Sequence, residues 1–484
     1  MKLDNPQLLR EQCFIAGEWV GSASIEVINP ATDKKLGQVP SLERQAVEDA
    51  IAAAAKAFDS WRCVSAQERG NYLYRWYELL QAHREDLARI MTAEQGKPLA
   101  ESRGEIDYAA SYIKWFAEEA RRAYGEIIPA DKPGSQMLVM PEPVGVCAAI
   151  TPWNFPAAMI TRKAAAALAA GCTMVVKPSG LTPLSALALA YLAEQAGIPA
   201  GVFNVLTGDS AEIGKIFCQS RQVKKLSFTG STEVGRRLMA QSADNLQKLS
   251  LELGGNAPLI VFNDADIARA VQGTLAAKFR NSGQTCICPN RFLLQTEIHD
   301  GFVDALSAAV AELPVGNGMD ADVKITSLIN SKAVTKIQQH YDDALAKGAR
   351  CVYGERPGSL PHQQVAPVIL TNVSPKAQLW QEETFGPLVA ITRFTTEEEA
   401  LALANDTQYG LAAYAFTRDA DRIWRLGREL KTGMLGINEG AISNAAAPFG
   451  GVDQSGFGRE GSRHGLYEYL QLKYVCVGPA VSEQ

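Results

Sequence analysis

The residues best suited to chemistry are a thiol and a carboxyl group, each close to glycine. Cys286 follows the polar segment Phe279–Thr285, whereas most other cysteines lie within apolar runs. A reactive cysteine needs partial exposure and surroundings that favour the thiolate, which such a segment can provide. A core or metal-site cysteine is the alternative, although Cys286 and Cys288 have no second Cys/His pair nearby to complete a zinc site. The segment alone supports catalytic and structural roles equally.

The carboxyl group belongs to Glu252, which lies at the end of the apolar run Leu249–Leu253 and just before Gly254 and Gly255. Burial raises the pKa of such a group toward the range of a general base. A buried salt bridge is the alternative. The few histidines are all outside strand-end or glycine-rich settings, at positions 83, 299, 340, 362 and 464. A Cys–His pair is therefore hard to build, which leaves Glu252 as the better candidate base.

Two further segments could bind a dinucleotide where expected strands end. Gly230 and Ser231 follow one strand and open a helix, whose free N–H groups can meet a pyrophosphate. Lys177, Ser179 and Gly180 follow another strand and could place a cation and a hydroxyl near an adenosine ribose. An ordinary turn is the alternative for both segments.

Asn154 lies in the aromatic and proline-rich segment Thr151–Pro156, which follows the first strand of the same expected sheet. A side-chain amide fixed there could stabilise an oxyanion. A rigid turn whose asparagine caps the next helix is the alternative.

The elements that would position these residues alternate between strand and helix. Strands are expected at Val144–Ile150, Thr173–Lys177, Val202–Leu206, Lys225–Phe228 and Lys248–Leu253, and helices at Ala157–Ala170, Pro183–Gln195 and Ala211–Gln219. This alternation predicts a parallel sheet that binds ligands at the carboxyl ends of its strands. A second alternation begins at Pro258–Phe262 and predicts a second α/β domain. Earlier, periodic apolar residues predict helices at Glu43–Ser60 and Ala66–Glu94, after a hairpin near Phe14–Val27.

Composition agrees with a globular enzyme of more than one domain. The 484 residues exceed one ordinary core, and 47% hydrophobic against 21% charged residues argues against disorder. A net charge of −6 argues against nucleic acid or an anionic membrane as a partner. No apolar run reaches the roughly 20 residues of a membrane span, and Met1–Pro6 does not resemble a secretory signal. Nine scattered cysteines predict reduced thiols in the cytoplasm.

Together, several segments resemble the aldehyde dehydrogenase family across nearly the whole chain, and most closely its succinate-semialdehyde and glutarate-semialdehyde branch. The segments that carry the resemblance are Pro152–Pro156, Phe228–Ser231, Leu251–Gly255, Gly283–Cys286, Glu382–Pro387, Pro448–Gly451 and Ser455–Glu460. The resemblance implies oxidation of a small aldehyde through a thiohemiacetal and thioester on Cys286, with Glu252 as general base. Asn154 and the backbone N–H of Cys286 would form the oxyanion hole. No metal is implied.

The same resemblance implies NADP or NAD as cofactor. The implied cofactor-binding residues are Trp153, Lys177, Ser179, Gly180, Gly230, Ser231, Leu253, Glu383 and Phe385. Many NAD-preferring members carry a glutamate where this chain has Gly180, so NADP is admissible and NAD is not excluded.

The semialdehyde branch holds the distal carboxylate of its substrate with two arginines and a serine. This chain has Arg162, Arg280 and Ser443 at the matching positions, and arginine can bind a carboxylate bidentately. A succinic or glutaric semialdehyde is therefore the expected substrate. The alternatives are a broad-specificity dehydrogenase for uncharged aldehydes and a cysteine hydrolase without nicotinamide. Cys288 resembles a redox partner that can form a reversible disulfide with the nucleophile, and a plain structural role as a small residue is the alternative.

The family resemblance also implies the architecture. We expect an α/β fold with a Rossmann-type cofactor domain from residues 1–126 and 143–254 and a catalytic α/β domain from residues 255–454. A small β arm for oligomerisation would comprise residues 127–142 and 455–484. A homodimer or homotetramer is expected, because a terminal strand often pairs with another subunit.

Overall fold

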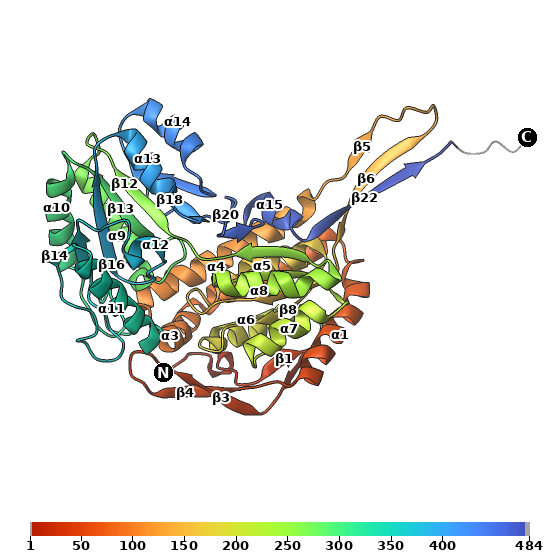
Figure 1. Cartoon of the computed structure of the whole chain (residues 1–484). Coiled ribbons are helices and arrows are strands. Elements are labelled where there is room, and N and C mark those ends of the chain that lie inside the picture. The colour runs from red at the N-terminus through yellow and green to blue at the C-terminus, as the bar shows by residue number, and fades with distance from the viewer. Residues whose placement is uncertain (1, 480–484) are drawn as a thin grey trace, which may run out of the picture.

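The computed structural model describes residues 2–479. Residue 1 of the predicted first domain and residues 480–484 of the predicted arm lie outside this range. Two sheets and a projecting arm organise the chain (Figure 1). The first sheet has eight strands in the order β2-β1-β9-β8-β7-β10-β11-β21. Their bounds are β1 (Cys13–Ile15), β2 (Glu18–Val20), β7 (Val146–Ile150), β8 (Thr173–Lys177), β9 (Phe203–Val205), β10 (Val223–Thr229), β11 (Lys248–Glu252) and β21 (Gly456–Phe457).

Strands β7 to β11 of this sheet run parallel, and helices cover both of its faces. The helices are α1 (Arg44–Trp61), α2 (Ala66–Ala82), α3 (Arg84–Gln95), α4 (Leu99–Glu119), α5 (Ala158–Ala170), α6 (Pro183–Gln195), α7 (Ser210–Gln219) and α8 (Thr232–Ser242). Successive residues of a strand face opposite sides, so Cys147 and Ala149 join the core of α2–α6. Ala148 and Ile150 join the core of α1, α7 and α8.

The second sheet has seven strands in the order β14-β15-β16-β13-β12-β18-β19, all parallel except β14. They are β12 (Ala257–Val261), β13 (Pro289–Gln295), β14 (Arg350–Tyr353), β15 (Val368–Thr371), β16 (Leu388–Phe394), β18 (Ala412–Phe416) and β19 (Met434–Ile437). The helices of this half are α9 (Ile267–Lys278), α10 (His299–Ala311), α11 (Ser331–Ala346), α12 (Gln378–Gln381), α13 (Glu397–Asn405) and α14 (Ala420–Glu429). The predicted α/β class with two mainly parallel sheets is thereby confirmed.

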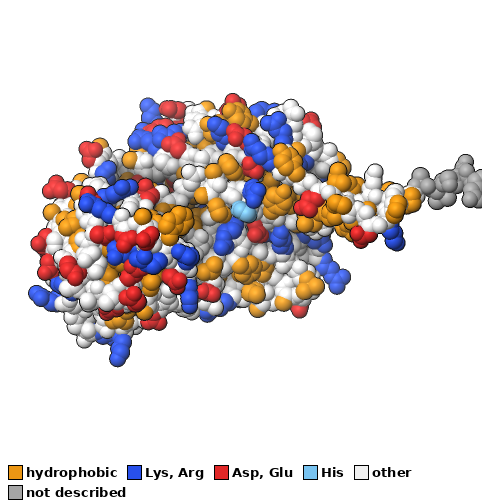
Figure 2. Space-filling view, turned by 90° about the horizontal axis from the view of Figure 1, so that it is seen from above, with side chains coloured by type: hydrophobic (Ala, Val, Ile, Leu, Met, Phe, Trp, Pro, Cys, Tyr) orange, Lys and Arg blue, Asp and Glu red, His pale blue; other side chains and the backbone are white. Residues whose placement is uncertain are grey.

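Three strands form the arm, which projects from the body (Figures 1 and 2). They are β5 (Glu126–Ile128), β6 (Gln136–Pro143) and β22 (Leu470–Val477). The long strand β22 pairs antiparallel with β6 from Leu470 opposite Pro143 to Val477 opposite Gln136. The short helix α15 (Ser462–Tyr467) precedes it. Two small ribbons complete the fold, β3 (Ala23–Ile28) with β4 (Lys35–Pro40), and β17 (Tyr409–Gly410) with β20 (Val452–Asp453).

The structure corrects two local predictions. The helix expected over Ala66–Glu94 is interrupted at His83, whose backbone leaves the helical region at φ −104° and ψ 18°, so α2 and α3 are separate helices. The hairpin expected near Phe14–Val27 ends with β2, because β3 pairs with β4 instead. Among residues 2–479, no helix is both long and apolar enough to cross a membrane.

Candidate active site

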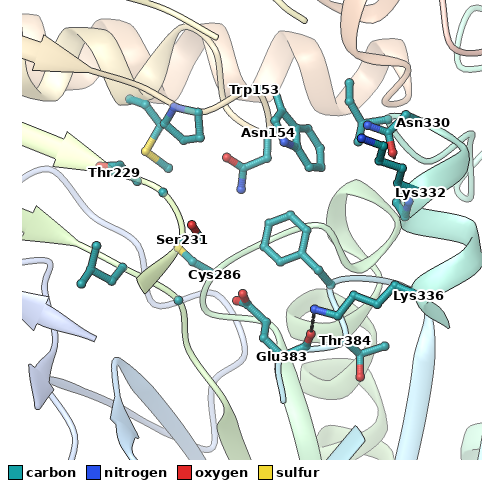
Figure 3. Close-up of a pocket in the computed structure, with 18 residues that line it drawn as sticks. Trp153, Asn154, Thr229, Ser231, Cys286, Asn330, Lys332, Lys336, Glu383 and Thr384 are labelled. Atoms are coloured by element: carbon teal, nitrogen blue, oxygen red, sulfur yellow. Dashed lines mark hydrogen bonds between the residues drawn. The ribbon is translucent and has the colours of Figure 1, made fainter. Parts of the chain in front are cut away.

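A cleft lies where the carboxyl edge of the first sheet faces the second half of the chain. It has a volume of about 370 Å³, within the usual range for small-molecule sites. Trp153, Asn154 and Thr229 line it from the first half, and Cys286 and Glu383 line it from the second (Figure 3). The predicted nucleophile and the predicted oxyanion donor therefore meet in one cleft, although 132 residues of sequence separate them.

The loop before Cys286 has an unusual backbone. Within the 3-10 helix η4 (Arg280–Gly283), Asn281 and Ser282 adopt left-handed conformations at φ 52° and 54°, and both side chains are buried. Such conformations are strained for residues other than glycine and concentrate at functional sites. Cys286 itself is half-buried. Burial raises the pKa of its thiol to about 12, while the nearby positive charge of Arg162 acts in the opposite direction.

Asn154 is tied to the nucleophile loop. Its side-chain Nδ2 donates to the backbone oxygen of Gln284 at 3.1 Å, and its amide group points toward Cys286 in Figure 3. One N–H of the amide remains for a ligand, because an asparagine amide carries two. This geometry suits stabilisation of negative charge that develops on a carbonyl attacked by Cys286.

Glu252 lies at the carboxyl end of β11, next to this cleft, but does not line it; its neighbours Leu253 and Gly254 do. The side chain is 2% exposed, and neither carboxylate oxygen has a hydrogen-bond partner among residues 2–479. Burial, followed by the nearby carboxylate of Glu460, raises the pKa of Glu252 well above its usual value. Within the described chain, the carboxyl group has no hydrogen bond to break before it rotates toward the cleft.

The residues predicted to contact a nicotinamide cluster around the cleft. Gly230, Ser231 and Leu253 line one side, and Ser231 caps α8 by accepting from the N–H of Val234 at 3.4 Å. Unpaired N–H groups at a helix start of this kind can bind an anion.

Glu383 and Phe385 line the same cleft. Glu383 accepts from the N–H of Gly255 at 3.3 Å, and burial raises the pKa of its carboxyl to about 7. Phe385 has a left-handed backbone with φ 60°, and its ring contacts Trp153 edge-on with centroids 5.6 Å apart.

The predicted ribose-binding residues Lys177, Ser179 and Gly180 do not line the cleft. Lys177 ends β8 and is 2% exposed, and its Nζ donates to the hydroxyl of Ser210 at the start of α7. Burial lowers the pKa of Lys177 to about 8. Ser179 accepts from the N–H of Leu181, and no atom lies within 4 Å of where a Cβ would stand on Gly180. This edge of the sheet therefore has room beside a lysine and carries no carboxylate at position 180.

Two lysines of the cleft were missed by the sequence analysis. Lys332 and Lys336 lie one turn apart at the start of α11 and point into the cleft (Figure 3). The Nζ of Lys336 donates to the backbone oxygen of Glu383 at 2.5 Å. A cation near a helix N-terminus is unfavourable because it opposes the helix dipole. Two lysines at the start of a helix are therefore the one local signal that could have indicated these residues.

A second, smaller cavity continues behind Cys286. The three predicted substrate contacts, Arg162, Arg280 and Ser443, all line it together with Tyr108, Phe155 and Phe449. Arg162 forms an ion pair with Glu460, yet its buried Nη2 has no hydrogen-bond partner among residues 2–479. Arg280 stacks over the Phe155 ring at 5.1 Å, and within the same residues no carboxylate lies within 4 Å of it. The cavity thus combines apolar walls with two cations.

Cys288 faces away from this chemistry. Its side chain is 8% exposed, and its Sγ contacts the backbone oxygens of Lys278 and Pro289, each at 3.6 Å. A disulfide between Cys286 and Cys288 would require the loop to rearrange, and the redox role of Cys288 stays a prediction. Among residues 2–479, no group of three or more His, Cys, Asp and Glu side chains is arranged to hold a metal ion.

Comparison with known proteins agrees with this geometry. The model of the aldehyde dehydrogenase family matches residues 19–475. The chain belongs to the aldehyde dehydrogenase family. This dehydrogenase is 52% identical to the glutarate-semialdehyde dehydrogenase of Pseudomonas aeruginosa over 99% of its own length and 100% of the relative. It is 53% identical to the NADP(+) succinate-semialdehyde dehydrogenase of Escherichia coli, again over 99% and 100% of the two chains.

Solved structures of other aldehyde dehydrogenases share the fold. An aldehyde dehydrogenase from Brucella melitensis superposes with a TM-score of 0.98 at 52% identity, covering 99% of this dehydrogenase and 100% of that chain. A betaine aldehyde dehydrogenase from Staphylococcus aureus, solved in complex with NAD+, gives a TM-score of 0.94 at 37% identity, with coverage of 98% and 97%. The predicted family fold is confirmed.

Proposed function

We propose that this aldehyde dehydrogenase oxidises a short semialdehyde acid, succinic or glutaric semialdehyde, to the dicarboxylic acid. The observation that supports the proposal is the small cavity at Cys286, which Arg162 and Arg280 also line. The unpartnered Nη2 of Arg162 and the unpaired charge of Arg280 suit a carboxylate. Ser443 adds a hydroxyl donor to the same cavity.

The names of the relatives support a carboxylated or otherwise anionic aldehyde. In addition to the succinate- and glutarate-semialdehyde dehydrogenases, a 3-sulfolactaldehyde dehydrogenase of Pseudomonas putida is 50% identical over 99% of each chain. These substrates share an aldehyde at one end and an anionic group at the other. An arginine-lined cavity of this kind would serve all three, so the choice among them depends on chain length and on the shape of the anion.

In this proposal, the Cys286 thiolate attacks the aldehyde carbon, and the new C–S bond leaves an oxyanion held by Asn154 Nδ2 and the Cys286 N–H. Bound NADP or NAD supplies the acceptor for the hydride that leaves this carbon. A thioester then remains on Cys286. Glu252, after rotation toward the cleft, takes a proton from water, and the resulting attack releases the carboxylic acid and regenerates the thiolate.

The cleft has positive groups, a carboxylate and aromatic side chains that together could bind a dinucleotide. The helix start at Ser231 and the lysines at positions 332 and 336 provide positive potential. Glu383 could accept from ribose hydroxyls, and Trp153 with Phe385 provides aromatic walls. Lys177 and the space at Gly180 would accept either a 2′-hydroxyl or a 2′-phosphate, so both coenzymes are admissible.

The arm supports assembly into a homodimer or homotetramer. Ile127, Leu472 and Tyr474 are 83%, 66% and 58% exposed on it, and apolar side chains gather along it in Figure 2. Such exposed apolar surface commonly pairs with another subunit. The division into residues 1–126 with 143–254, 255–454, and 127–142 with 455–484 stays a proposal. Within it, β21 pairs with β11 in the first sheet, so β22 is the part of the last segment that joins the arm.

All nine cysteines are free thiols, which supports a reducing compartment such as the cytoplasm.

Coenzyme reduction followed at 340 nm tests the function. Succinic and glutaric semialdehydes are compared with butanal and pentanal, each with NAD and NADP. We expect kcat/KM for a semialdehyde to exceed that for the matching uncharged aldehyde by about tenfold or more, equivalent to roughly 1.4 kcal/mol. Equal values would favour a broad-specificity enzyme, and thioester hydrolysis without coenzyme reduction would favour a cysteine hydrolase.

A further inference from the structure

The connection between α3 and α4 packs against both loops that form the active site. Gly96 ends α3 in a left-handed conformation with φ 97°, which turns the chain so that the Lys97 side chain points inward. That side chain is 1% exposed, although lysine is rarely buried so completely. No step of the proposed reaction uses Lys97.

Lys97 holds the backbone of the oxyanion segment. Its Nζ donates to the backbone oxygen of Asn154 at 2.7 Å and forms a buried ion pair with Glu105. The other carboxylate oxygen of Glu105 accepts from the N–H groups of Ala157 and Ala158 at 3.0 and 3.3 Å. One ion pair therefore fixes the segment at its asparagine and again at the start of α5.

The same carbonyl is also tied to the nucleophile loop. Asn281 Nδ2 donates to the backbone oxygen of Asn154 at 3.0 Å, and Gln95 Nε2 in turn donates to Asn281 Oδ1 at 3.0 Å. Glu101 accepts from the Asn281 N–H at 2.6 Å. Asn154 closes the circuit by donating from Nδ2 to the Gln284 oxygen. The α3–α4 connection thus holds the amide donor and the cysteine loop in one hydrogen-bonded arrangement.

The buried Lys97–Glu105 pair is better explained by the geometry that it imposes than by the stability that it adds. A buried ion pair adds little net stability compared with apolar side chains of similar volume, because both charges lose their hydration. Hydrogen bonds to charged groups nevertheless fix donor and acceptor geometry closely. An oxyanion donor requires such precision, since displacement of a reacting group by about 1 Å can lower the rate by about 10²-fold.

We propose that Lys97, with Glu105 as its counter-ion, is a positioning residue that orients the Asn154 amide toward the carbonyl attacked by Cys286. The inference rests on the proposed function, because it assumes that Asn154 stabilises the oxyanion. It adds a residue from outside the cleft that acts through a backbone carbonyl and touches neither substrate nor coenzyme.

The test replaces the pair together, because Lys97→Met alone would leave Glu105 as an uncompensated buried charge. In Lys97→Met/Glu105→Gln the methionine fills the lysine volume, and the glutamine oxygen can still accept from the start of α5. We expect kcat per titrated Cys286 to fall by about 10- to 100-fold, with the KM for coenzyme changed by less than about twofold. Active sites are counted by iodoacetamide labelling of Cys286, which corrects for any misfolded fraction.

The matched control is Lys225→Met/Glu468→Gln. Lys225 is also fully buried and pairs with Glu468 at 3.2 Å, but near the other end of β10 from the cleft. We expect this variant to lower the melting temperature and to leave kcat per titrated site within about twofold. A similar loss of kcat in the control would mean that any buried ion pair is needed for activity, which would overturn the specific role of Lys97.

A double-mutant cycle tests whether Lys97 acts through Asn154. In an Asn154→Ala background the amide to be positioned is gone, so the Lys97/Glu105 change should lower kcat by no more than about twofold further. A full additional loss would overturn the proposal. The assays use succinic semialdehyde and butanal in parallel. If the unmodified protein turns over neither aldehyde, the proposed function is wrong. If the unmodified protein is active and the Lys97 variant is equally active, only the positioning role is wrong.

Discussion

The guanidinium of Arg162 and the carboxylate of Glu460 form a buried ion pair beside the small cavity at Cys286. Glu460 also pairs with Lys163, so two cations share one carboxylate at this position. Arg280, on the other wall, has no carboxylate within 4 Å among residues 2–479. Because no described carboxylate forms an ion pair with it, Arg280 should provide more of the selectivity for an anionic substrate than Arg162 does.

Arg280→Ala should therefore abolish most of the preference for carboxylated substrates. We expect kcat/KM for succinic semialdehyde to fall by about 10- to 100-fold, as for loss of a charge-assisted hydrogen bond, and kcat/KM for butanal to change by less than about threefold. Arg350→Ala, on the exposed edge strand β14, is the control. An equal loss with both aldehydes would show that Arg280 instead holds the cysteine loop in place.

The reactivity of Cys286 should depend steeply on pH. With a pKa of about 12, the thiolate fraction in the absence of coenzyme rises about tenfold per pH unit below that value. The rate of alkylation by iodoacetamide should follow this slope from pH 7 to 9, as measured by mass spectrometry of the Cys286 peptide. A plateau below pH 8 would contradict the prediction. The exposed Cys63 in the same sample provides an internal comparison.

Glu252→Gln should separate thioester formation from its hydrolysis. The substitution keeps the shape of the side chain and removes its ability to take a proton, so a rapid burst of about one reduced coenzyme per site should persist. The steady-state rate should fall by about 10²- to 10⁴-fold. Stopped-flow absorbance measures both phases, with the exposed Glu398→Gln of α13 as control. Loss of the burst with an unchanged steady rate would reverse the assignment.

Gly180→Glu should shift coenzyme preference toward NAD. The position has no atom within 4 Å of a new Cβ, so the first carbon of a side chain there meets no neighbouring atom. A carboxylate near the adenosine ribose would repel a 2′-phosphate, and the ratio of kcat/KM for NADP over NAD should fall by about tenfold or more. Gly180→Gln is the neutral control and should leave the ratio within about threefold. An equal shift in the control would indicate a steric effect.

If Cys288 is a redox partner, it should protect Cys286 against irreversible oxidation by peroxide. If Cys286 and Cys288 form a disulfide after peroxide treatment, dithiothreitol should restore activity to the unmodified protein and fail to restore it to Cys288→Ala, whose nucleophile oxidises further. Recovery of activity after each treatment is the measurement. Equal recovery in both proteins would discard the disulfide and leave Cys288 as a packing residue against Lys278.

Local patterns in the sequence predicted many elements well, because short-range forces set their limits. Strand β8 (Thr173–Lys177) and helix α6 (Pro183–Gln195) match their expected ranges residue for residue. A proline at the first turn starts α6, and apolar β-branched residues favour β8. The break at His83 had no such signal, since the apolar period continues through it from α2 into α3.

The parallel strands, the position of Cys286 after a polar loop and the candidate residues for its chemistry could all be predicted from sequence patterns. Which of these groups come into contact became clear from the folded arrangement. It placed Glu252 outside the cleft lining, Lys336 inside it, and Lys97 against the Asn154 carbonyl from 57 residues away. Local periodicity reports which face of an element is buried. The partner of a single buried charge depends on how distant elements pack, and that information lies in no short segment of the chain.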